Sequence, residues 1–319
     1  MATDPMVQRA IALDIRAEAL RRGEFQLVRP AAADVVPVVL AGLDDPEGWI
    51  ETGIAPLDRL LDGGLRGGEV CVIAARPGVG KSALALQIIL RVVEEWPVYL
   101  WSLEMPPETW LLRAVCSVSG VPMDRARRGE LTALEGERVR HVTKEIGRYP
   151  LFFSGGPTDP MGWVAEARSA VECDDCRLLC VDYLQLLDPP REAYSRENEV
   201  ATISRTIKMV ANELNVPILL LAQLNRNAEG KSPSLADLRE SGAVEQDADI
   251  VTFIHREKDA KAHVMENTGR ITVAKNRNGR LGTFGIEYDG AHFRFRCFDG
   301  AHQYDPQAGA GGYRQTPNL

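Results

Sequence analysis

Short apolar runs alternate with longer amphipathic stretches through the middle of the chain. Almost continuous apolar runs are typical of strands that are buried on both faces of a sheet. These runs cover residues 70–74, 98–102, 178–181, 218–222 and 250–254. Helical periodicity is predicted between them over residues 82–94, 107–117, 160–172 and 199–214. The alternation predicts an α/β fold with a mainly parallel sheet flanked by helices.

Three closely spaced runs near the end of the chain follow a different pattern. They cover residues 270–275, 283–288 and 292–298. The dipeptides Asn278-Gly279 and Asp289-Gly290 separate them, and such dipeptides favour tight hairpin turns. We therefore expect antiparallel strands at the C-terminal end of the sheet.

The two ends of the chain differ from this core. A mixed-charge helix is predicted over residues 5–22, and a linker with Pro30, Pro37 and Pro46 over residues 26–50. The tail from Ala301 is rich in Gly, Pro and Gln and is predicted to be disordered. The expected organisation is an N-terminal helix and linker over 1–50, one domain over 51–300, and a tail over 301–319.

Composition narrows the class of protein only moderately. An apolar fraction of 45% and a charged fraction of 26% are ordinary for a globular protein. No apolar run has the ~20 residues that span a bilayer, and the N-terminus lacks secretory features, so we expect a cytoplasmic protein without membrane contact. The net charge of −8 argues weakly against nucleic acid as a partner. The six cysteines are expected to be reduced, and Cys173 and Cys176 lack the further ligands of a zinc site.

A phosphate-binding loop is predicted directly after the first apolar run. Residues 75–82 have the sequence ARPGVGKS and open a predicted helix. Backbone N–H groups at such a loop and helix start attract phosphate oxygens. Lys81 is expected to reach the β- and γ-phosphates and Ser82 to bind Mg²⁺. The general pattern has glycine where this chain has Ala75, a substitution that costs little if the backbone there is ordinary. The candidate nucleotide-binding residues are Ala75, Arg76, Pro77, Gly78, Val79, Gly80, Lys81 and Ser82.

Two carboxylates end neighbouring predicted strands. Asp182 follows four apolar residues and is expected to hold the Mg²⁺ shell, although an acidic strand end facing solvent is the alternative. Glu104 lies two residues after the run 98–102, at the edge where parallel strands face a ligand crevice. It is a candidate to polarise the attacking water. A helix-capping glutamate is the alternative for Glu104.

Further polar residues follow the later strands. Gln223 ends a very apolar run and could sense the γ-phosphate or serve only as a structural cap. The segment 237–249 is crowded with charge, which usually means a solvated face. Lys275 and Arg277 lie at a strand end, and an outward-pointing Arg277 could complete a neighbour's active site as an arginine finger.

These motifs, in this order, resemble the C-terminal ATPase domain of the DnaB-type replicative helicases. The resemblance runs from about Thr52 to Phe298 and is carried by TGIAPLDRLLDGGLRGGEV, ARPGVGKS, SLEM, VDYLQLL, ELNVP, QLNR, DLRESGAVEQDADI and KNRNG. Family members have ARP at the start of the phosphate loop, so Ala75 agrees with them. The resemblance implies a RecA-like P-loop NTPase fold, ATP and Mg²⁺, a homohexameric ring and 5′ to 3′ translocation on single-stranded DNA.

The same resemblance assigns roles to individual residues. It implies that Glu104 is the catalytic carboxylate, Asp182 the Walker B aspartate and Gln223 the γ-phosphate sensor. Lys275 and Arg277 would act across the subunit interface. Arg239, Glu240 and Gly242 match the loop that tracks the DNA backbone, and six such loops can grip a strand without a basic surface overall.

The N-terminal part and the function keep alternatives open. The family has a larger helical N-terminal domain that forms a collar and engages primase, whereas about 50 residues precede Thr52 here. The helix over 5–22 could dock on the adjacent subunit or remain a non-interacting leader, and a primase or loader is a possible partner. The competing functions are a RecA- or RadA-like recombination ATPase and a DNA-independent nucleotide-switch ring. Fold alone does not separate them.

Overall fold

The structure is a computed structural model that describes residues 49–154, 160–182, 196–225, 231–258 and 265–298. The predicted helix over 5–22, the predicted tail from Ala301 and most of the predicted linker lie outside these residues. The first described residue is Trp49, which is the second-last residue of the linker predicted over 26–50. There β1 (Trp49–Ile50) pairs with β2 (Leu65–Arg66) in a small antiparallel sheet.

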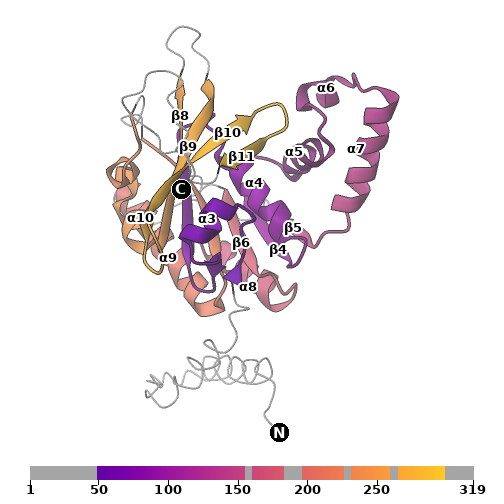
Figure 1. The fold of residues 1–319 in the computed structure, drawn as a ribbon. Helices are drawn as coiled ribbons and strands as arrows, with labels where there is room; N and C mark the ends of the chain where they lie inside the picture. Colours follow the sequence, from indigo (N-terminus) through magenta and orange to yellow (C-terminus); the bar gives the residue numbers. More distant parts are fainter. Residues whose placement is uncertain (1–48, 155–159, 183–195, 226–230, 259–264, 299–319) are drawn as a thin grey trace. The chain divides into compact units, whose positions relative to one another are not determined.

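A nine-stranded sheet forms the centre of the described residues (Figure 1). Its strand order is β11-β10-β9-β8-β3-β7-β6-β4-β5. The strands of the parallel part are β3 (Val70–Ala75), β4 (Val98–Ser102), β5 (Leu151–Ser154), β6 (Leu178–Asp182), β7 (Ile218–Gln223) and β8 (Ile250–Lys258). The antiparallel part follows as β9 (Met265–Asn276), β10 (Gly282–Asp289) and β11 (Arg294–Phe298). The predicted mixed sheet is confirmed.

Helices cover both faces of this sheet because its central strands are apolar on both sides. In β3, Cys71 and Ile73 face one core, whereas Val72 and Ala74 face the other. The first core is closed by α3 (Ala55–Leu60), α4 (Lys81–Val92) and α5 (Pro107–Ser119). The second is closed by α8 (Pro160–Glu172), α9 (Arg196–Leu214) and α10 (Gly242–Asp247).

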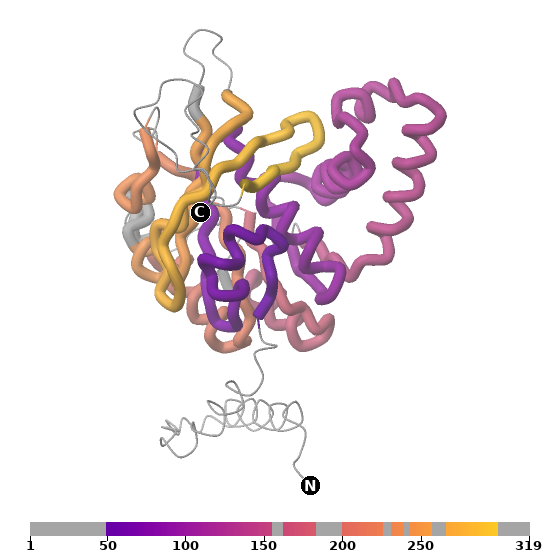
Figure 2. The backbone as a smooth tube through the Cα atoms, in the orientation of Figure 1, coloured from indigo at the N-terminus to yellow at the C-terminus, as the bar shows by residue number. Residues whose placement is uncertain are grey.

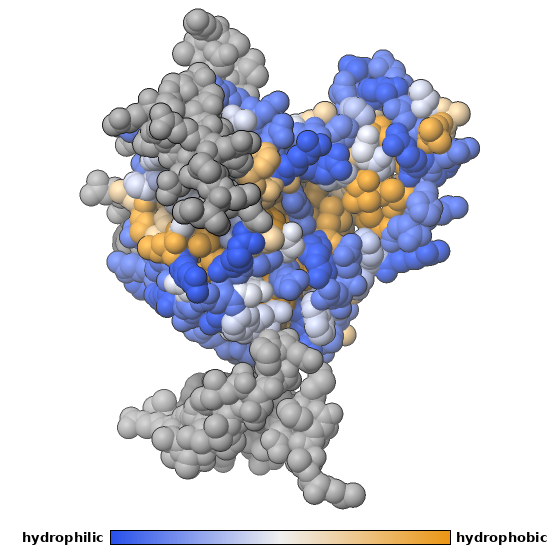
Figure 3. Space-filling model, viewed as in Figure 1, coloured by the Kyte–Doolittle hydropathy of each residue, from blue (hydrophilic) through white to orange (hydrophobic). Residues whose placement is uncertain are grey.

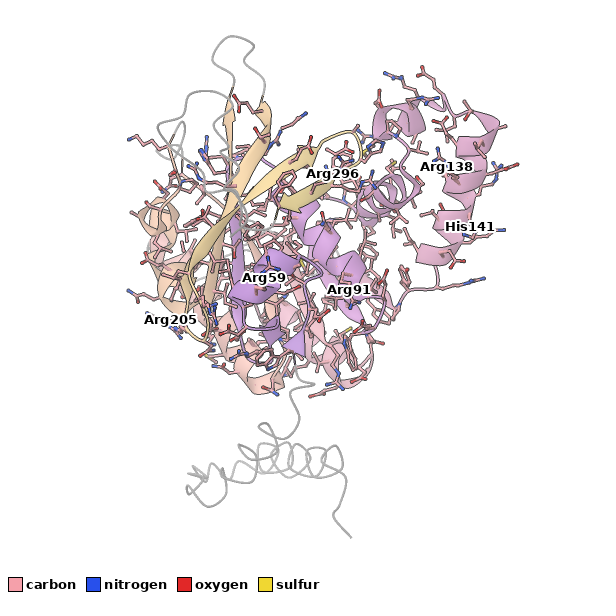
Figure 4. All side chains as sticks on the ribbon, viewed as in Figure 1. Arg59, Arg91, Arg138, His141, Arg205 and Arg296 are labelled. Atoms are coloured by element: carbon pink, nitrogen blue, oxygen red, sulfur yellow. The ribbon has the colours of Figure 1, made fainter. Side chains whose placement is uncertain are left out.

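A helical arm leaves the sheet between β4 and β5 (Figures 1 and 2). It consists of α5, α6 (Met123–Arg128) and α7 (Ala133–Ile146). Helix α7 begins with a capping box between Thr132 and Glu135, in which each residue satisfies an N–H group of the other. Apolar side chains of α5 and α7 meet in the angle between the helices, and part of this area is visible at the surface (Figure 3). Arg138 and His141 are exposed side chains of α7 (Figure 4).

Most predicted elements appear within a few residues of their expected ends. The apolar runs predicted β3, β4, β6 and β7 closely, and α8 has its predicted bounds. The arm helices α6 and α7, edge strand β5, and the segment of η4 (Leu235–Ser241) and α10 were not predicted. Strand β5 is only partly buried and four residues long, so its pattern is weak. Among the described residues, no helix is long and apolar enough to cross a membrane.

Candidate nucleotide-binding site

The phosphate loop connects the end of β3 to the start of α4. Gly78 has φ 76° and Gly80 has φ 118°, both in the region that favours glycine. A Cβ atom at Gly80 would also lie 2.6 Å from Phe295 Cζ. A glycine-containing loop that leads into a helix N-terminus is a favourable place for an anion. Ala75 is the last residue of the regular strand β3, so its position does not require glycine.

Two arginines hold the loop from outside. Arg76 Nη1 donates to the Leu224 carbonyl at 2.9 Å. Arg256 Nη1 donates to the Val79 carbonyl at 3.1 Å, and its guanidinium stacks on the Tyr288 ring at 4.4 Å. Arg256 is buried, so this bond forms in a poorly solvated place where it resists exchange with water. The loop is therefore held in shape by the strands on either side.

Lys81 and Asp182 face each other next to the loop. Lys81 Nζ lies 3.7 Å from Asp182 Oδ1, and the Asp182 side chain is fully buried. Among the described residues, neither Asp182 carboxylate oxygen has a hydrogen-bond partner. Burial raises the pKa of Asp182 to about 6 although Lys81 opposes the rise, and burial also lowers the pKa of Lys81. A buried carboxylate that lacks its hydrogen bonds is a suitable ligand for a cation.

Glu104 lies in a turn that is fixed by its neighbour Ser102. Ser102 Oγ donates to the Met105 carbonyl at 2.6 Å and accepts from Trp110 Nε1 at 2.9 Å. The backbone N–H of Leu103 donates to the Asp182 carbonyl at 2.8 Å. Helix α5 begins after Pro106 without a side-chain cap, so the helix-capping alternative for Glu104 is wrong. Glu104 is close enough to affect the pKa values of both Lys81 and Asp182.

A cleft of about 290 Å³ brings most of the predicted nucleotide residues together. Its volume is near the lower end of the range for small-molecule sites. The predicted residues that line it are Ala75, Arg76, Pro77, Gly78, Gly80, Lys81, Ser82, Glu104 and Gln223. Val79 and Asp182 are buried beside it and do not line it. Gln223 reaches the cleft because it pairs in register with Ala75.

Sequence reasoning missed five further residues of this cleft: Ala83, Met105, Arg113, Tyr288 and Phe293. The Arg113 guanidinium lies 4.9 Å from the Phe293 ring centre. Burial lowers the pKa of Arg113. Phe293 has φ 51°, which is strained for an aromatic residue and is often found at functional sites. A lone cation within the apolar helix 107–119 was a signal for Arg113, whereas Tyr288 and Phe293 come from the distant β10–β11 hairpin.

Lys275 and Arg277 lie at the opposite edge of the sheet from the phosphate loop. Arg277 Nη1 lies 3.2 Å from Asp249 Oδ1, and Asp249 precedes β8 beside Val70, the first residue of β3. The loop follows Ala75, the last residue of β3, so roughly 17 Å of strand separates the two edges. Lys275 Nζ donates to the Glu245 carbonyl at 2.5 Å. Neither cation belongs to the cleft of its own chain, which agrees with the hypothesis of a role in another copy.

The predicted DNA-contacting residues Arg239, Glu240 and Gly242 lie where η4 meets α10. This segment connects the two edges of the sheet along α9. At its start, the Asn225 N–H donates to the Asp237 carbonyl at 3.2 Å, just beyond β7. At its end, carbonyls of Glu245 and Gln246 accept from Lys275 and Arg277. The expected solvated face is wrong for part of the segment, since Leu238, Val244 and Asp249 are buried.

A mainly parallel sheet covered on both faces, with a phosphate loop after its central strand β3 and carboxylates at the ends of β6 and β4, defines a RecA-like P-loop NTPase. Residues 49–297 match the family of the DnaB-like helicase C terminal domain, and the chain belongs to this family.

The relatives agree with this assignment. The chain is 36% identical over 251 residues to the replicative DNA helicase DnaB of Treponema pallidum (strain Nichols), a match that covers 78% of this chain and 56% of that protein. The chain therefore spans little more than half the length of this relative. One solved structure, described as an ATPase domain, has a TM-score of 0.75 and 28% identity, over 84% of this chain and 98% of that one. A DnaB-like replicative helicase, described with its interactions with primase, has a TM-score of 0.72 and 26% identity, over 90% and 76%.

Asp182→Asn is expected to stabilise the nucleotide-free chain at pH 7 by about 1–2 kcal/mol. Because the folded pKa of Asp182 is raised from 3.8 to about 6, its ionised form is unfavourable in the folded state. As the pH rises from 3.8 to about 6, Asp182 ionises and the free energy of unfolding of the wild-type chain should fall. The free energy of unfolding of the variant should not fall in this way. The gain is smaller than the pKa shift alone implies, since the variant also removes the carboxylate that faces Lys81.

Urea unfolding of both chains between pH 4 and pH 7, without nucleotide or Mg²⁺, measures the difference. A variant that is less stable than the wild type at pH 7 would contradict the claim that ionised Asp182 destabilises the folded state.

Proposed function

We propose that this chain is an ATP-driven helicase that translocates 5′ to 3′ on single-stranded DNA and unwinds duplex during DNA replication. The observation that carries the proposal is the meeting of Lys81, Asp182 and Glu104 at one phosphate loop in a chain of the DnaB-like helicase family. The curated relatives named replicative DNA helicase DnaB support the same function. Family membership disfavours the recombination ATPase and the nucleotide switch.

The phosphates of ATP are proposed to bind at the N-terminus of α4. The loop N–H groups and the Lys81 ammonium would hold them, and Arg113 adds a second cation at the cleft. Partly buried cations act more strongly than fully exposed ones on the charge that develops at the leaving phosphate oxygens. Gln223 lies beside the loop at the end of β7 and would donate its amide to the terminal phosphate.

The Asp182 carboxylate and the Ser82 hydroxyl are proposed to hold Mg²⁺. The fit rests on the two buried Asp182 oxygens without hydrogen-bond partners among the described residues. Mg²⁺ commonly uses one or two protein ligands together with substrate phosphates and water. The ion neutralises charge on the transferring phosphoryl group when it is bound. No cluster of three or more acidic, His or Cys ligands occurs among the described residues, which agrees with a site of this sparse kind.

Glu104 is proposed to orient the attacking water and accept its proton. The Ser102 hydrogen bonds and the Leu103 bond to β6 hold its turn, and rigid support of this sort improves catalytic geometry. Asp182 is the more deeply buried of the two carboxylates, so the two acids are suited to different tasks. Asp182 would serve the cation and Glu104 the water.

Completion of the site is proposed to need a second copy of the chain. Lys275 and Arg277 are displayed at the far edge of the sheet, where they could reach the cleft of a neighbour. Repetition of this heterologous contact gives a closed ring when the rotation closes, and a homohexamer is the ring that we propose. The segment 235–247 connects the residues proposed for DNA contact with these two cations, which suggests how DNA could stimulate hydrolysis.

A forked DNA substrate tests the proposed function. With ATP and Mg²⁺, the chain is expected to unwind forks that carry a 5′ single-stranded tail and not forks with only a 3′ tail. Glu104→Gln serves as the inactive control. ATP hydrolysis stimulated by DNA without unwinding would instead favour the recombination ATPase. Hydrolysis that is indifferent to DNA would favour the nucleotide switch.

A further inference from the structure

Asp249 is a buried carboxylate at the centre of an ion cluster, at the edge of the sheet that carries Arg277. Its Oδ2 atom accepts from the Val70 N–H at 2.9 Å and from Lys208 Nζ at 2.6 Å. Its Oδ1 atom lies 3.2 Å from Arg277 Nη1. The Asp249 side chain is only 7% exposed. One carboxylate therefore contacts a cation on α9, a cation in the turn after β9 and a backbone donor on β3.

The carboxylate is held much more firmly than the arginine. Lys208 lies on α9 and also donates to the Gly68 carbonyl at 2.8 Å. The backbone of Asp249 is fixed as well, since its N–H donates to the Val70 carbonyl at 3.0 Å. Asp249 is therefore tied to the start of β3 and to α9, which are parts of the core. Arg277, in contrast, has a side chain that is 48% exposed.

Arg277 has two side-chain hydrogen bonds to other described residues. Its Nη1 contacts Asp249, and its Nη2 donates to the Gln246 carbonyl at 2.6 Å. A guanidinium has five N–H donors in a planar fork, so two such bonds orient the plane and leave donors for another acceptor. The backbone beneath it is also fixed, because the Arg277 N–H donates to the Asp249 carbonyl at 3.0 Å.

The charge of the cluster suits contact with phosphate. A lone Asp249–Arg277 pair would be neutral and would weaken the attraction of Arg277 for an anion. Lys208 contacts the same Asp249 carboxylate as Arg277 and supplies a second positive charge. The three side chains together therefore retain one net positive charge, and Arg277 is the more exposed of the two cations.

We propose that Asp249 is a positioning residue, which, with Lys208 as its counter-charge, sets the direction in which Arg277 reaches the nucleotide of a neighbouring copy. This inference rests on the proposed function of Arg277 in trans. The alternative is that the cluster only stabilises the fold. The two differ in one respect: a positioning effect passes through Arg277, and a structural effect does not.

A double-mutant cycle separates these alternatives. Asp249→Asn is expected to lower kcat for ATP hydrolysis by on the order of tenfold or more, as small misplacements do, with little change in KM for ATP. In the Arg277→Ala background the same substitution should have no further effect on kcat. Glu213→Gln is the matched control, since Glu213 is a surface carboxylate on α9 that is paired with Arg168 at 3.0 Å, and it should leave kcat unchanged.

Mixing experiments and a second variant distinguish a positioning effect from misfolding of the variant chain. Asp249→Asn chains mixed with Glu104→Gln chains should regain activity, because some interfaces then join an intact cleft to an intact Arg277. If Asp249→Asn does not fold, Lys208→Met replaces it and should likewise lower kcat only when Arg277 is present. An equal loss of kcat with and without Arg277, from whichever variant is used, would overturn the proposal, as would an unchanged kcat. An unaltered kcat in Arg277→Ala alone would instead reject the trans role of Arg277 itself.

Discussion

Replacing Arg277 by alanine is expected to lower kcat for ATP hydrolysis by on the order of a thousandfold, the scale of arginine-finger removal. ATP affinity should change little, because Arg277 lies at the edge of the sheet opposite the phosphate loop of its own chain. The variant should also fold, since Lys208 still neutralises Asp249. The measurements are steady-state hydrolysis and equilibrium nucleotide binding of the assembled protein.

A role of Arg277 in trans predicts a second property of the Arg277→Ala variant. Arg277→Ala chains mixed with Glu104→Gln chains should recover activity at interfaces that pair an intact Glu104 with an intact Arg277. Arg148→Ala is a suitable control, because Arg148 is 74% exposed and pairs only with Glu145 among the ion pairs of the described residues. If mixed assemblies form and show no recovery at any ratio, Arg277 does not act in trans.

Replacing Lys81 by alanine is expected to reduce ATP hydrolysis at least a hundredfold, the usual cost of removing one electrostatic stabiliser from a preorganised site. Lys81 begins α4 and faces Asp182 at 3.7 Å. Without it, both the phosphates and the buried Asp182 carboxylate lose their nearest cation, and the pKa of Asp182 should rise further. ATP binding should also weaken, which distinguishes this variant from Arg277→Ala.

The control for Lys81→Ala is Lys144→Ala, which removes an exposed lysine from α7. Both variants should be compared in hydrolysis and in nucleotide binding. Unchanged turnover in Lys81→Ala would remove the basis for a nucleotide site at this loop.

The central sheet was predictable because its signals are local. The apolar run 70–74 and the glycines of the loop are consecutive in sequence, so the strand, turn and helix start are specified together. Asp182 and Glu104 were identifiable for the same reason, since Asp182 directly follows the predicted strand 178–181 and Glu104 lies two residues after the predicted strand 98–102. Parallel strands place their carboxyl ends at one edge, and this rule brought both carboxylates to the loop.

The rest of the site depends on contacts between distant segments. Tyr288 and Phe293 reach the cleft only because β9, β10 and β11 extend the sheet beyond β8, and no spacing rule predicts that placement. The hydrogen bonds of Arg256 and Asp249 likewise join residues that are 177 and 179 positions apart in sequence. The helices α6 and α7 were missed because each has only one buried residue, so their apolar periodicity is weak.

The proposed function depends above all on a response of ATP hydrolysis at this cleft to single-stranded DNA. The most direct test is the steady-state rate of ATP hydrolysis by the purified chain at saturating ATP and Mg²⁺, measured across concentrations of an unstructured single-stranded oligonucleotide. We expect a rate that rises severalfold to a plateau in the wild-type chain and stays at background in Glu104→Gln. A measurable wild-type rate that does not change at any DNA concentration would contradict the proposed function.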